Sequence, residues 1–507
     1  MEPAIIFKTK IRNHYLHSTR MNRFLLCHPI LYYLVDLVRK GVDVREWLDG
    51  LDTDTVDLGD CGIFKREELA YYYRKYLFLR EHRYFEKVDI GRKVGDRLKA
   101  ESVQVKLANT SQLTFEVTDA CNLNCRYCAY GEFYSDYDRR ESKNLSIHKA
   151  KRFLNYLLDL WNSPLNTSHH QTTFVTFYGG EPLLNFSFIR EMVEYVKHLD
   201  LRHNRIEFSM TTNGLLLEKY MDFLVQNDFQ ILISLDGNER HNGYRVFKND
   251  KPAYRQIMLN IMVLRQKYPD FFVEKVRFNA VLHKKNRITE VYQFFQETFN
   301  KFPSLSEVNP YGIVPEKKEQ FRQTYRNLYE DLNQAEDYFK EEKQKRMALP
   351  KPRRVVNIIR RYSGVVFRKY DELIFSSEIR QFVPTGTCVP FSRMVFLTVN
   401  GKILPCERIG HQFALGRVDD DRVELDFEQV ARKYNQYYDS LSKQCTVCYN
   451  TEACVQCIFN LNILDAHPQC NGFKNYQDIR RHFSFAMSYM EENPETYFKV
   501  LKEMTFG

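Results

Sequence analysis

Strand-like and helix-like hydrophobic patterns alternate through the middle of the chain. Short apolar runs rich in β-branched and aromatic residues indicate strands at 113–120, 172–179, 205–213, 229–236, 273–282 and 304–313. The segments between them, such as 148–161 and 186–199, place apolar residues at helical spacing. Repeated strand–helix units favour a parallel sheet covered by helices. We therefore expect an α/β domain over 108–315.

A smaller unit precedes this domain. Residues 1–100 begin with short apolar runs that indicate strands, and helix-like segments follow at 29–41 and 66–86. The first of these helices has Pro29 at its start and Gly41 at its end, which is the usual asymmetry of helix termini. The pattern predicts a small α+β domain.

Three regions follow the α/β domain. Residues 316–385 are charged and helix-like, and we interpret them as a bridging segment. Its basic stretch at 351–369 indicates either a solvated helix or a contact with RNA or an acidic peptide. Residues 386–475 are rich in cysteine, and residues 476–507 have a helical pattern.

The composition is that of a globular protein with a mild positive charge. Hydrophobic residues make up 44% of the 507 residues, and the net charge is +9, from 74 basic and 65 acidic side chains. This charge is compatible with an acidic peptide or nucleic acid as a partner and requires neither. The sequence has no run of about eighteen apolar residues, and its N-terminus lacks a signal-peptide pattern. We expect a cytoplasmic protein.

The cysteines are grouped. Ten of the twelve lie at 121–128 and 388–470, and only Cys27 and Cys61 fall outside these groups. We interpret those two as incidental buried or structural thiols. In a long cytoplasmic chain, grouped cysteines indicate metal or iron–sulfur ligation rather than disulfides.

The first group forms the motif Cys121-x3-Cys125-x2-Cys128, directly after the strand-like run at 113–120. Three thiolates on one short loop can bind three irons of a [4Fe–4S] cube and leave the fourth iron open. Half of a zinc site and a redox thiol loop are the alternatives. A second motif, Gly179-Gly180-Glu181-Pro182, closes the run at 172–179, where paired glycines permit a close approach of a ligand.

With these motifs, residues 110–475 resemble radical S-adenosylmethionine (SAM) enzymes. The resemblance implies a partial (β/α)6 barrel with its chemistry at the carboxyl ends of the strands. It implies that Cys121, Cys125 and Cys128 bind the SAM cluster, and Tyr127 fits the aromatic position of the loop. The turn formed by Gly179, Gly180 and Glu181 would receive the amino group of SAM.

Other strand ends carry further polar residues. The resemblance implies that Ser234 and Arg255 bind the SAM carboxylate, with Arg245 as the rival arginine. Asn213 and Asp236 would reach the ribose, act as acid–base groups or cap the following helices. Asn279 would point toward the nucleoside or serve a turn or the core.

The second cysteine group resembles the SPASM extension of peptide-modifying radical SAM enzymes. It contains Gly401-x4-Cys406 and Cys445-x2-Cys448-x5-Cys454-x2-Cys457, whereas the family pattern ends in C-x3-C. The resemblance implies two auxiliary [4Fe–4S] clusters, and so three clusters in all. One would use Cys445, Cys448, Cys454 and Cys470, and the other would use Cys388, Cys406 and Cys457. The second set lacks a fourth thiolate, so a non-cysteine ligand or a substrate thiolate would complete it. Two zinc knuckles are the alternative.

The resemblance implies a peptide maturase that reductively cleaves SAM to a 5′-deoxyadenosyl radical and oxidatively modifies a ribosomally made peptide. Residues 1–100 resemble a winged-helix peptide-recognition domain, which would bind the leader of the precursor peptide. A flavodoxin or ferredoxin would donate electrons, and we expect neither a membrane nor a nucleic acid as partner. An anaerobic sulfatase maturase that forms formylglycine is the nearest alternative. A zinc-dependent nucleic-acid-binding protein is an alternative of another class.

Overall fold

The computed structural model describes residues 4–86, 98–168, 171–328 and 386–503, together with residues 331, 355, 356, 358, 359 and 362. Among these residues, no helix is both long and apolar enough to cross a membrane. The bridging segment expected at 316–385 falls mostly outside the described residues. Its described beginning contains the helix α12 (Lys318–Thr324).

The described residues contain one large sheet, and its first six strands form a parallel α/β unit. The sheet order is β11-β10-β9-β8-β7-β6-β12-β13-β14-β15, and each neighbouring pair from β11 to β6 is parallel. The bounds of the six strands are β6 (Gln112–Thr118), β7 (Gln171–Gly179), β8 (Asn204–Thr212), β9 (Gln230–Ser234), β10 (Val276–Leu282) and β11 (Ser304–Glu307). The α/β fold with a parallel sheet is thus confirmed.

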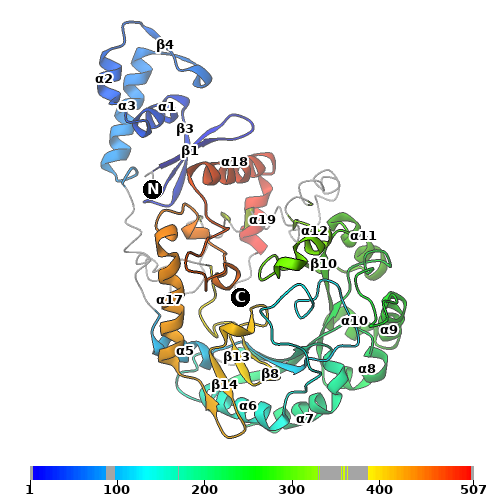
Figure 1. The fold of residues 1–507 in the computed structure, drawn as a ribbon. Helices are drawn as coiled ribbons and strands as arrows, with labels where there is room; N and C mark the ends of the chain where they lie inside the picture. The colour runs from blue at the N-terminus through cyan, green and yellow to red at the C-terminus, as the bar shows by residue number, and fades with distance from the viewer. Residues whose placement is uncertain are drawn as a thin grey trace.

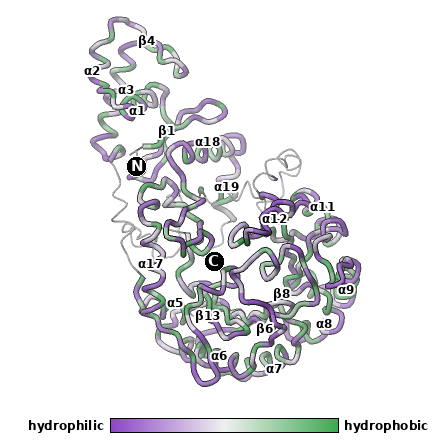
Figure 2. Tube along the Cα trace, in the orientation of Figure 1, coloured by the Kyte–Doolittle hydropathy of each residue, from purple (hydrophilic) through white to green (hydrophobic). Residues whose placement is uncertain are grey.

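Amphipathic helices cover the outer side of these strands (Figure 1). They are α6 (Ile147–Trp161), α7 (Phe186–Lys197), α8 (Leu217–Gln226), α9 (Tyr254–Lys267), α10 (Pro269–Lys275) and α11 (Ile288–Phe299). Along them, hydrophobic and hydrophilic residues alternate in short intervals (Figure 2). The expected strand at 273–282 starts only at Val276, because Pro269 begins the short helix α10.

The cysteine-rich region continues the same sheet. Strand β12 (Val395–Leu397) pairs in parallel with β6, and the antiparallel strands β13 (Lys402–Leu404), β14 (Gly416–Val418) and β15 (Val423–Glu424) extend it. Gly401, in the turn before β13, has φ +78°, and a Cβ there would lie 2.3 Å from the carbonyl oxygen of Val418. This close approach explains the glycine of the G-x4-C motif, whose cysteine follows β13.

Two helices from distant parts of the sequence lie side by side against this region. The long helix α17 (Phe427–Cys445) contacts α5 (Ala100–Ala108), as Figure 1 shows. The side chain of Asn435 accepts a hydrogen bond from the backbone N–H of Leu98 at 2.9 Å and donates one to its carbonyl at 3.0 Å. The segment at the expected boundary near residue 100 therefore packs on the large α/β body.

The N-terminal residues form a small unit of strands and helices. Its sheet has the order β1-β2-β3, and both neighbouring pairs are antiparallel. The elements are β1 (Ala4–Lys8), β2 (His14–Ser18), β3 (Arg23–Cys27), α1 (Pro29–Arg39), α2 (Val44–Asp49), β4 (Thr55–Asp57), β5 (Ile63–Lys65) and α3 (Arg66–Glu81). The helix expected at 29–41 begins with Pro29 as its first residue. The likeness of this unit to a winged helix stays a prediction.

Helix α18 (Tyr476–Glu492) closes the outer edge of β1. Backbone groups of Ile6, Lys8 and Lys10 form hydrogen bonds of 2.6 to 3.4 Å with side chains of this helix. Those side chains are spaced four residues apart and are Tyr476, Arg480, Ser484 and Ser488. Tyr476 and Arg480 both bind Ile6, and from Arg480 to Ser488 each four helical residues, a rise of about 6 Å, match two strand residues, about 6.6 Å.

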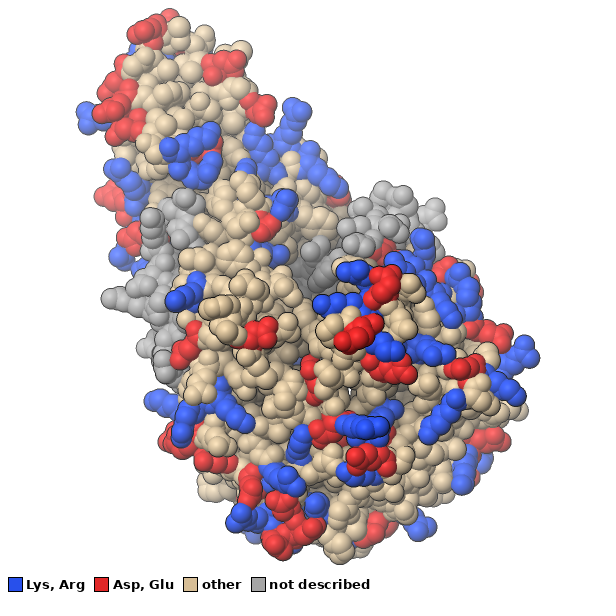
Figure 3. Space-filling view, viewed as in Figure 1, with Lys and Arg blue, Asp and Glu red and all other residues tan. Residues whose placement is uncertain are grey.

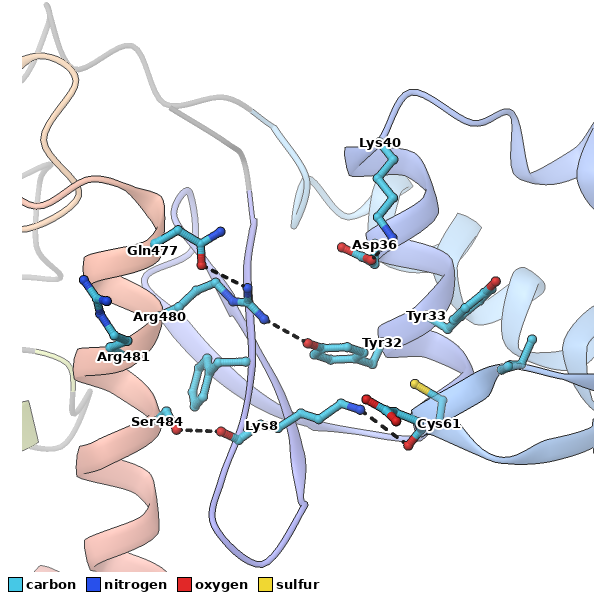
Figure 4. Close-up of a pocket in the computed structure, with 13 residues that line it drawn as sticks. Lys8, Tyr32, Tyr33, Asp36, Lys40, Cys61, Gln477, Arg480, Arg481 and Ser484 are labelled. Carbon is cyan, nitrogen blue, oxygen red and sulfur yellow. Dashed lines mark hydrogen bonds and ion pairs between the residues drawn. The ribbon is translucent and has the colours of Figure 1, made fainter.

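Figure 4 shows Arg480 and Ser484 reaching toward the first strand. Arg480 also donates a hydrogen bond to the hydroxyl of Tyr32 on α1 at 3.3 Å. The contact leaves a cavity of about 580 Å³ between α18, β1 and α1. A second C-terminal helix, α19 (Glu495–Glu503), follows, so the expected helical pattern at 476–507 is confirmed for the described residues.

Candidate active site

The three-cysteine loop lies directly after β6, at the carboxyl end of the parallel strands. A hydrogen-bond donor approaches each of its three sulfurs. The N–H of Leu123 lies 3.5 Å from the Cys121 sulfur, Arg140 Nη2 lies 3.5 Å from that of Cys128, and Arg245 Nη1 lies 4.0 Å from that of Cys125. Two of these donors are cationic, which suits thiolates that carry negative charge.

The residues of this loop fit a [4Fe–4S] cluster. Three thiols of one loop are the ligand set for such a cube with an open iron, and the surrounding donors favour an anionic group. Within the described part of the chain, no three His, Cys, Asp or Glu side chains are arranged closely enough for a single metal ion. Ligand type, cysteine spacing and the surrounding charge therefore favour a [4Fe–4S] cluster at this loop.

The Gly-Gly-Glu turn after β7 is built against the residues that lead into this loop. Its backbone N–H groups at Gly180 and Glu181 donate to the carbonyls of Thr118 and Ala120 at 2.8 and 2.9 Å. A Cβ on Gly180 would lie only 2.0 Å from the Ala120 oxygen, and Gly179 has φ +128°. Only glycine permits this contact, so the turn and the loop are fixed to each other.

Glu181 is fully buried and ties the turn to the end of β8. Its carboxyl accepts hydrogen bonds from the Thr212 hydroxyl and the Asn213 N–H, both at 2.8 Å. Burial raises the pKa of Glu181 to about 7. Through these hydrogen bonds, Glu181 joins the turn after β7 to the end of β8. The family pattern alone did not indicate this structural role.

Asn213 does not cap the following helix, because the cap position of α8 is Leu216. Its side-chain oxygen accepts from the N–H of Leu215 at 3.0 Å. Its amide nitrogen donates to the side chain of Asn122 at 2.7 Å, inside the cysteine loop. Asn213 thus connects the end of β8 to the loop.

Asp236 lies in a buried ion pair. Arg245 donates to its two oxygens at 3.0 and 3.1 Å, and the hydroxyl of Tyr127 donates to it as well. Burial alone would raise the pKa of Asp236, but Arg245 and His283 lower it well below its usual range. Asp236 was expected to reach the ribose, act as an acid–base group or cap a helix, and here it binds Arg245 and the loop residue Tyr127.

The two arginines that the sequence offered for the SAM carboxylate differ in position. Arg245 is buried and occupied by Asp236. Arg255, at the start of α9, is 87% exposed and lies 3.3 Å from Glu239. Ser234 ends β9 beside Asn279 of β10, and the side-chain oxygen of Asn279 accepts from Ser306 at 2.8 Å. The roles of Ser234, Arg255 and Asn279 stay predictions.

Sequence reasoning missed a buried carboxyl on β6. Leu113, Phe115 and Val117 belong to the main hydrophobic core, so Glu116 points to the opposite face of the strand. One of its oxygens accepts from the N–H of Val399 at 2.9 Å, which ties β6 to the turn before β13. A charged residue inside an apolar strand was the signal that could have revealed it.

The cysteines of the C-terminal region fall into two neighbourhoods. Burial raises the pKa of Cys445 to about 12, and nearby Cys454, Cys470 and Cys448 raise it further. Burial also raises the pKa of Cys457, and Cys388 adds to this increase. A buried tyrosine, Tyr434, has its pKa raised by burial and by the thiols of Cys457, Cys388 and Cys406. The assignment of these cysteines to two auxiliary clusters stays a prediction.

The fold is a parallel α/β sheet with a three-cysteine loop at the carboxyl end of its strands. Residues 115–296 match the Radical SAM superfamily. This segment is a radical SAM domain, homologous to anaerobic sulfatase maturases and to a radical SAM cyclopropyl synthase. The prediction from the cysteine loop and the Gly-Gly-Glu-Pro turn is thereby confirmed.

Two curated relatives show the extent of the similarity. The cysteine-type anaerobic sulfatase-maturating enzyme of Clostridium novyi is 32% identical over 232 residues, which are 42% of this chain and 58% of that protein. The radical SAM cyclopropyl synthase TigE of Paramaledivibacter caminithermalis is 24% identical over 228 residues, 44% of this chain and 45% of that protein. The chain thus spans about half the length of these relatives.

A solved structure shares the fold. Native anSMEcpe with bound AdoMet superposes with a TM-score of 0.50 at 18% identity, covering 78% of this chain and 100% of that chain. At this identity the likeness shows the fold alone. It extends beyond residues 115–296, which are the segment that matches the family.

Proposed function

We propose that this chain is a radical SAM enzyme that oxidatively modifies a peptide. The observation that carries the proposal is the cysteine loop at the end of β6, with the Gly-Gly-Glu turn fixed against it. When bound, a [4Fe–4S] cluster and SAM would supply the radical chemistry that removes a hydrogen atom from the substrate. Cys121, Cys125 and Cys128 would hold the cluster.

The protein's own residues would orient SAM. The turn at Gly179 and Gly180 offers backbone groups to the amino group. Ser234 and Arg255 would bind the carboxylate, and Arg255 suits this role because its guanidinium is exposed and its acidic neighbour lies in solvent. Asn213 would hold the cysteine loop in place beside the part of the site that binds the ribose.

The two C-terminal cysteine sets would hold auxiliary clusters that accept the electron left on the substrate. Strand β12 supports this proposal, since it joins the cysteine-rich region to β6 and so to the first loop. A flavodoxin or ferredoxin would reduce the enzyme. With three thiols, the set of Cys388, Cys406 and Cys457 would leave one iron for another ligand.

The N-terminal unit would capture the peptide as an added strand. The outer edge of β1 is closed by α18, whereas no described strand pairs with the outer edge of β3. A leader peptide would therefore pair with Arg23–Cys27. The visible face of the large α/β body mixes basic and acidic side chains (Figure 3), which gives no support to a nucleic-acid partner.

An anaerobic sulfatase maturase is the second candidate, because of the 32% identity to the Clostridium novyi enzyme. The two candidates predict different products. Formylglycine made from cysteine lacks sulfur, whereas the first candidate would form a thioether or carbon–carbon crosslink in the peptide, which loses only hydrogen.

The test starts with anaerobic reconstitution. Iron and acid-labile sulfide are counted, and 5′-deoxyadenosine is measured after addition of SAM and dithionite. Three cubes predict about twelve irons per chain.

Cysteine peptides of sulfatases and peptides encoded beside the gene are then compared as substrates by mass spectrometry. Hydrogen exchange of residues 23–27 reports leader binding. Absence of 5′-deoxyadenosine from iron-loaded protein would refute the proposal.

A further inference from the structure

A buried ion pair lies next to the cysteine loop, and a buried charge interacts strongly with other charges near it. The side chains of Arg245 and Asp236 are only 6% and 0% exposed. Removing two charges from water is costly unless they hold each other in good geometry. Here the guanidinium binds the carboxylate through Nε at 3.1 Å and Nη2 at 3.0 Å.

The third nitrogen of Arg245 faces the loop. Its Nη1 lies 4.0 Å from the sulfur of Cys125, and the guanidinium lies 5.5 Å from the ring centre of Tyr127. The positive end of the pair is therefore the end nearer to the sulfur.

The negative end is held in place from several sides. The N–H of Val281 on β10 donates to Asp236 at 3.0 Å, and His283 lies 3.4 Å from it. The hydroxyl of Tyr127, a residue of the loop itself, donates to the same carboxylate. With Asp236 fixed, Arg245 cannot turn away from Cys125 without losing both of its hydrogen bonds.

We propose that Arg245, positioned by Asp236, sets the reduction potential of the cluster bound by Cys121, Cys125 and Cys128. This inference rests on the proposed function. A cluster gains negative charge when it accepts an electron, and its potential depends on nearby charge and on hydrogen bonds to its sulfurs. In a buried, low-dielectric site, a cation beside a ligating sulfur stabilises the reduced cluster. Arg245 thus makes reduction easier, and Asp236 moderates this effect.

The experiment is a redox titration of the reconstituted full-length protein, followed by electron paramagnetic resonance. The signal to follow is the one that changes when SAM is added, which separates the first cluster from the auxiliary ones. Replacement Arg245→Met removes the cation, and we expect the ratio of reduced to oxidised cluster at a fixed potential to fall at least tenfold. For one electron this is a shift of about 59 mV to lower potential. Replacement Asp236→Asn should shift the potential in the opposite direction.

Controls separate charge from packing. Arg245→Lys keeps the charge, so its ratio of reduced to oxidised cluster at a fixed potential should stay within threefold of the wild-type ratio. Arg126, next to Cys125 in sequence, is 51% exposed and pairs with Asp250, so Arg126→Met should change the ratio less than twofold. The double variant Arg245→Met with Asp236→Asn leaves no unpaired buried ion. It keeps the test valid if the single variants misfold, and its potential should lie below that of the wild type.

The outcomes are distinct. Shifts of the same sign in Arg245→Met and Asp236→Asn, or an unchanged potential in Arg245→Met or the double variant, would overturn the inference and leave the proposed function intact. A wild-type protein that has no SAM-sensitive signal would overturn both.

Discussion

The buried carboxyl of Glu116 predicts an unusual dependence of stability on pH. Burial raises its pKa from 4.5 to about 7. Below pH 4.5 the group is protonated in both the folded and the unfolded state. Between pH 4.5 and 7 the unfolded chain releases the proton while the folded protein retains it, so stability falls as the pH rises. A shift of this size corresponds to about 3 kcal/mol, complete above pH 7.

Replacement of Glu116 by Gln removes the charge and keeps an oxygen for the N–H of Val399. The variant should match the wild type at pH 4.5 and exceed its free energy of unfolding by up to about 3 kcal/mol at pH 8. Urea unfolding of the anaerobic, iron-free protein at both pH values measures this difference. Glu424, exposed on β15, provides the matched control as Glu424→Gln. Parallel pH profiles for the wild type and Glu116→Gln would refute the reasoning.

Three further predictions concern the loop, the turn and the helix on β1. Gly180→Ala places a Cβ 2.0 Å from the Ala120 oxygen, so 5′-deoxyadenosine formation should fall at least tenfold while auxiliary iron is retained; full activity would contradict the account of the turn. Cys125→Ala should lower the iron content by about four per chain and abolish 5′-deoxyadenosine, whereas unchanged iron would remove Cys125 from the ligand set. Ser484→Ala removes the 2.6 Å hydrogen bond to Lys8 and should cost about 1 kcal/mol, seen as faster hydrogen exchange of residues 4–8; unchanged exchange would mean that this bond does not protect β1.

The sequence was sufficient for the parts of the fold that depend on local pattern. The six parallel strands follow from short apolar runs, and the positions of Cys121 and Gly180 follow from motifs that end two of those strands. The strand expected at 273–282 begins only at Val276, because Pro269 starts a helix that runs to Lys275. The proline in the sequence could have indicated this helix start.

Contacts between distant segments could not be predicted in the same way. The pairing of β12 with β6 joins Val395 to Leu113, and a three-residue apolar strand carries no information about its partner. The ion pair of Asp236 with Arg245 was equally hidden, because both residues also fit a role at the surface or at SAM. Burial decided between those roles, and burial depends on the packing of the whole domain.

The contact between α18 and β1 has a consequence for synthesis of the protein. Tyr476 lies 470 residues after Ile6, and ribosomes add about 5–20 residues per second, so the first strand waits roughly 25–95 s for its partner. During that interval its outer edge carries unpaired N–H and C=O groups, a template for pairing with other chains. In Figure 1 the N-terminus lies close to α18, near the end of the chain. The yield of folded protein will therefore depend on how well the nascent first strand is protected, and a chaperone should improve it more than changes to the barrel.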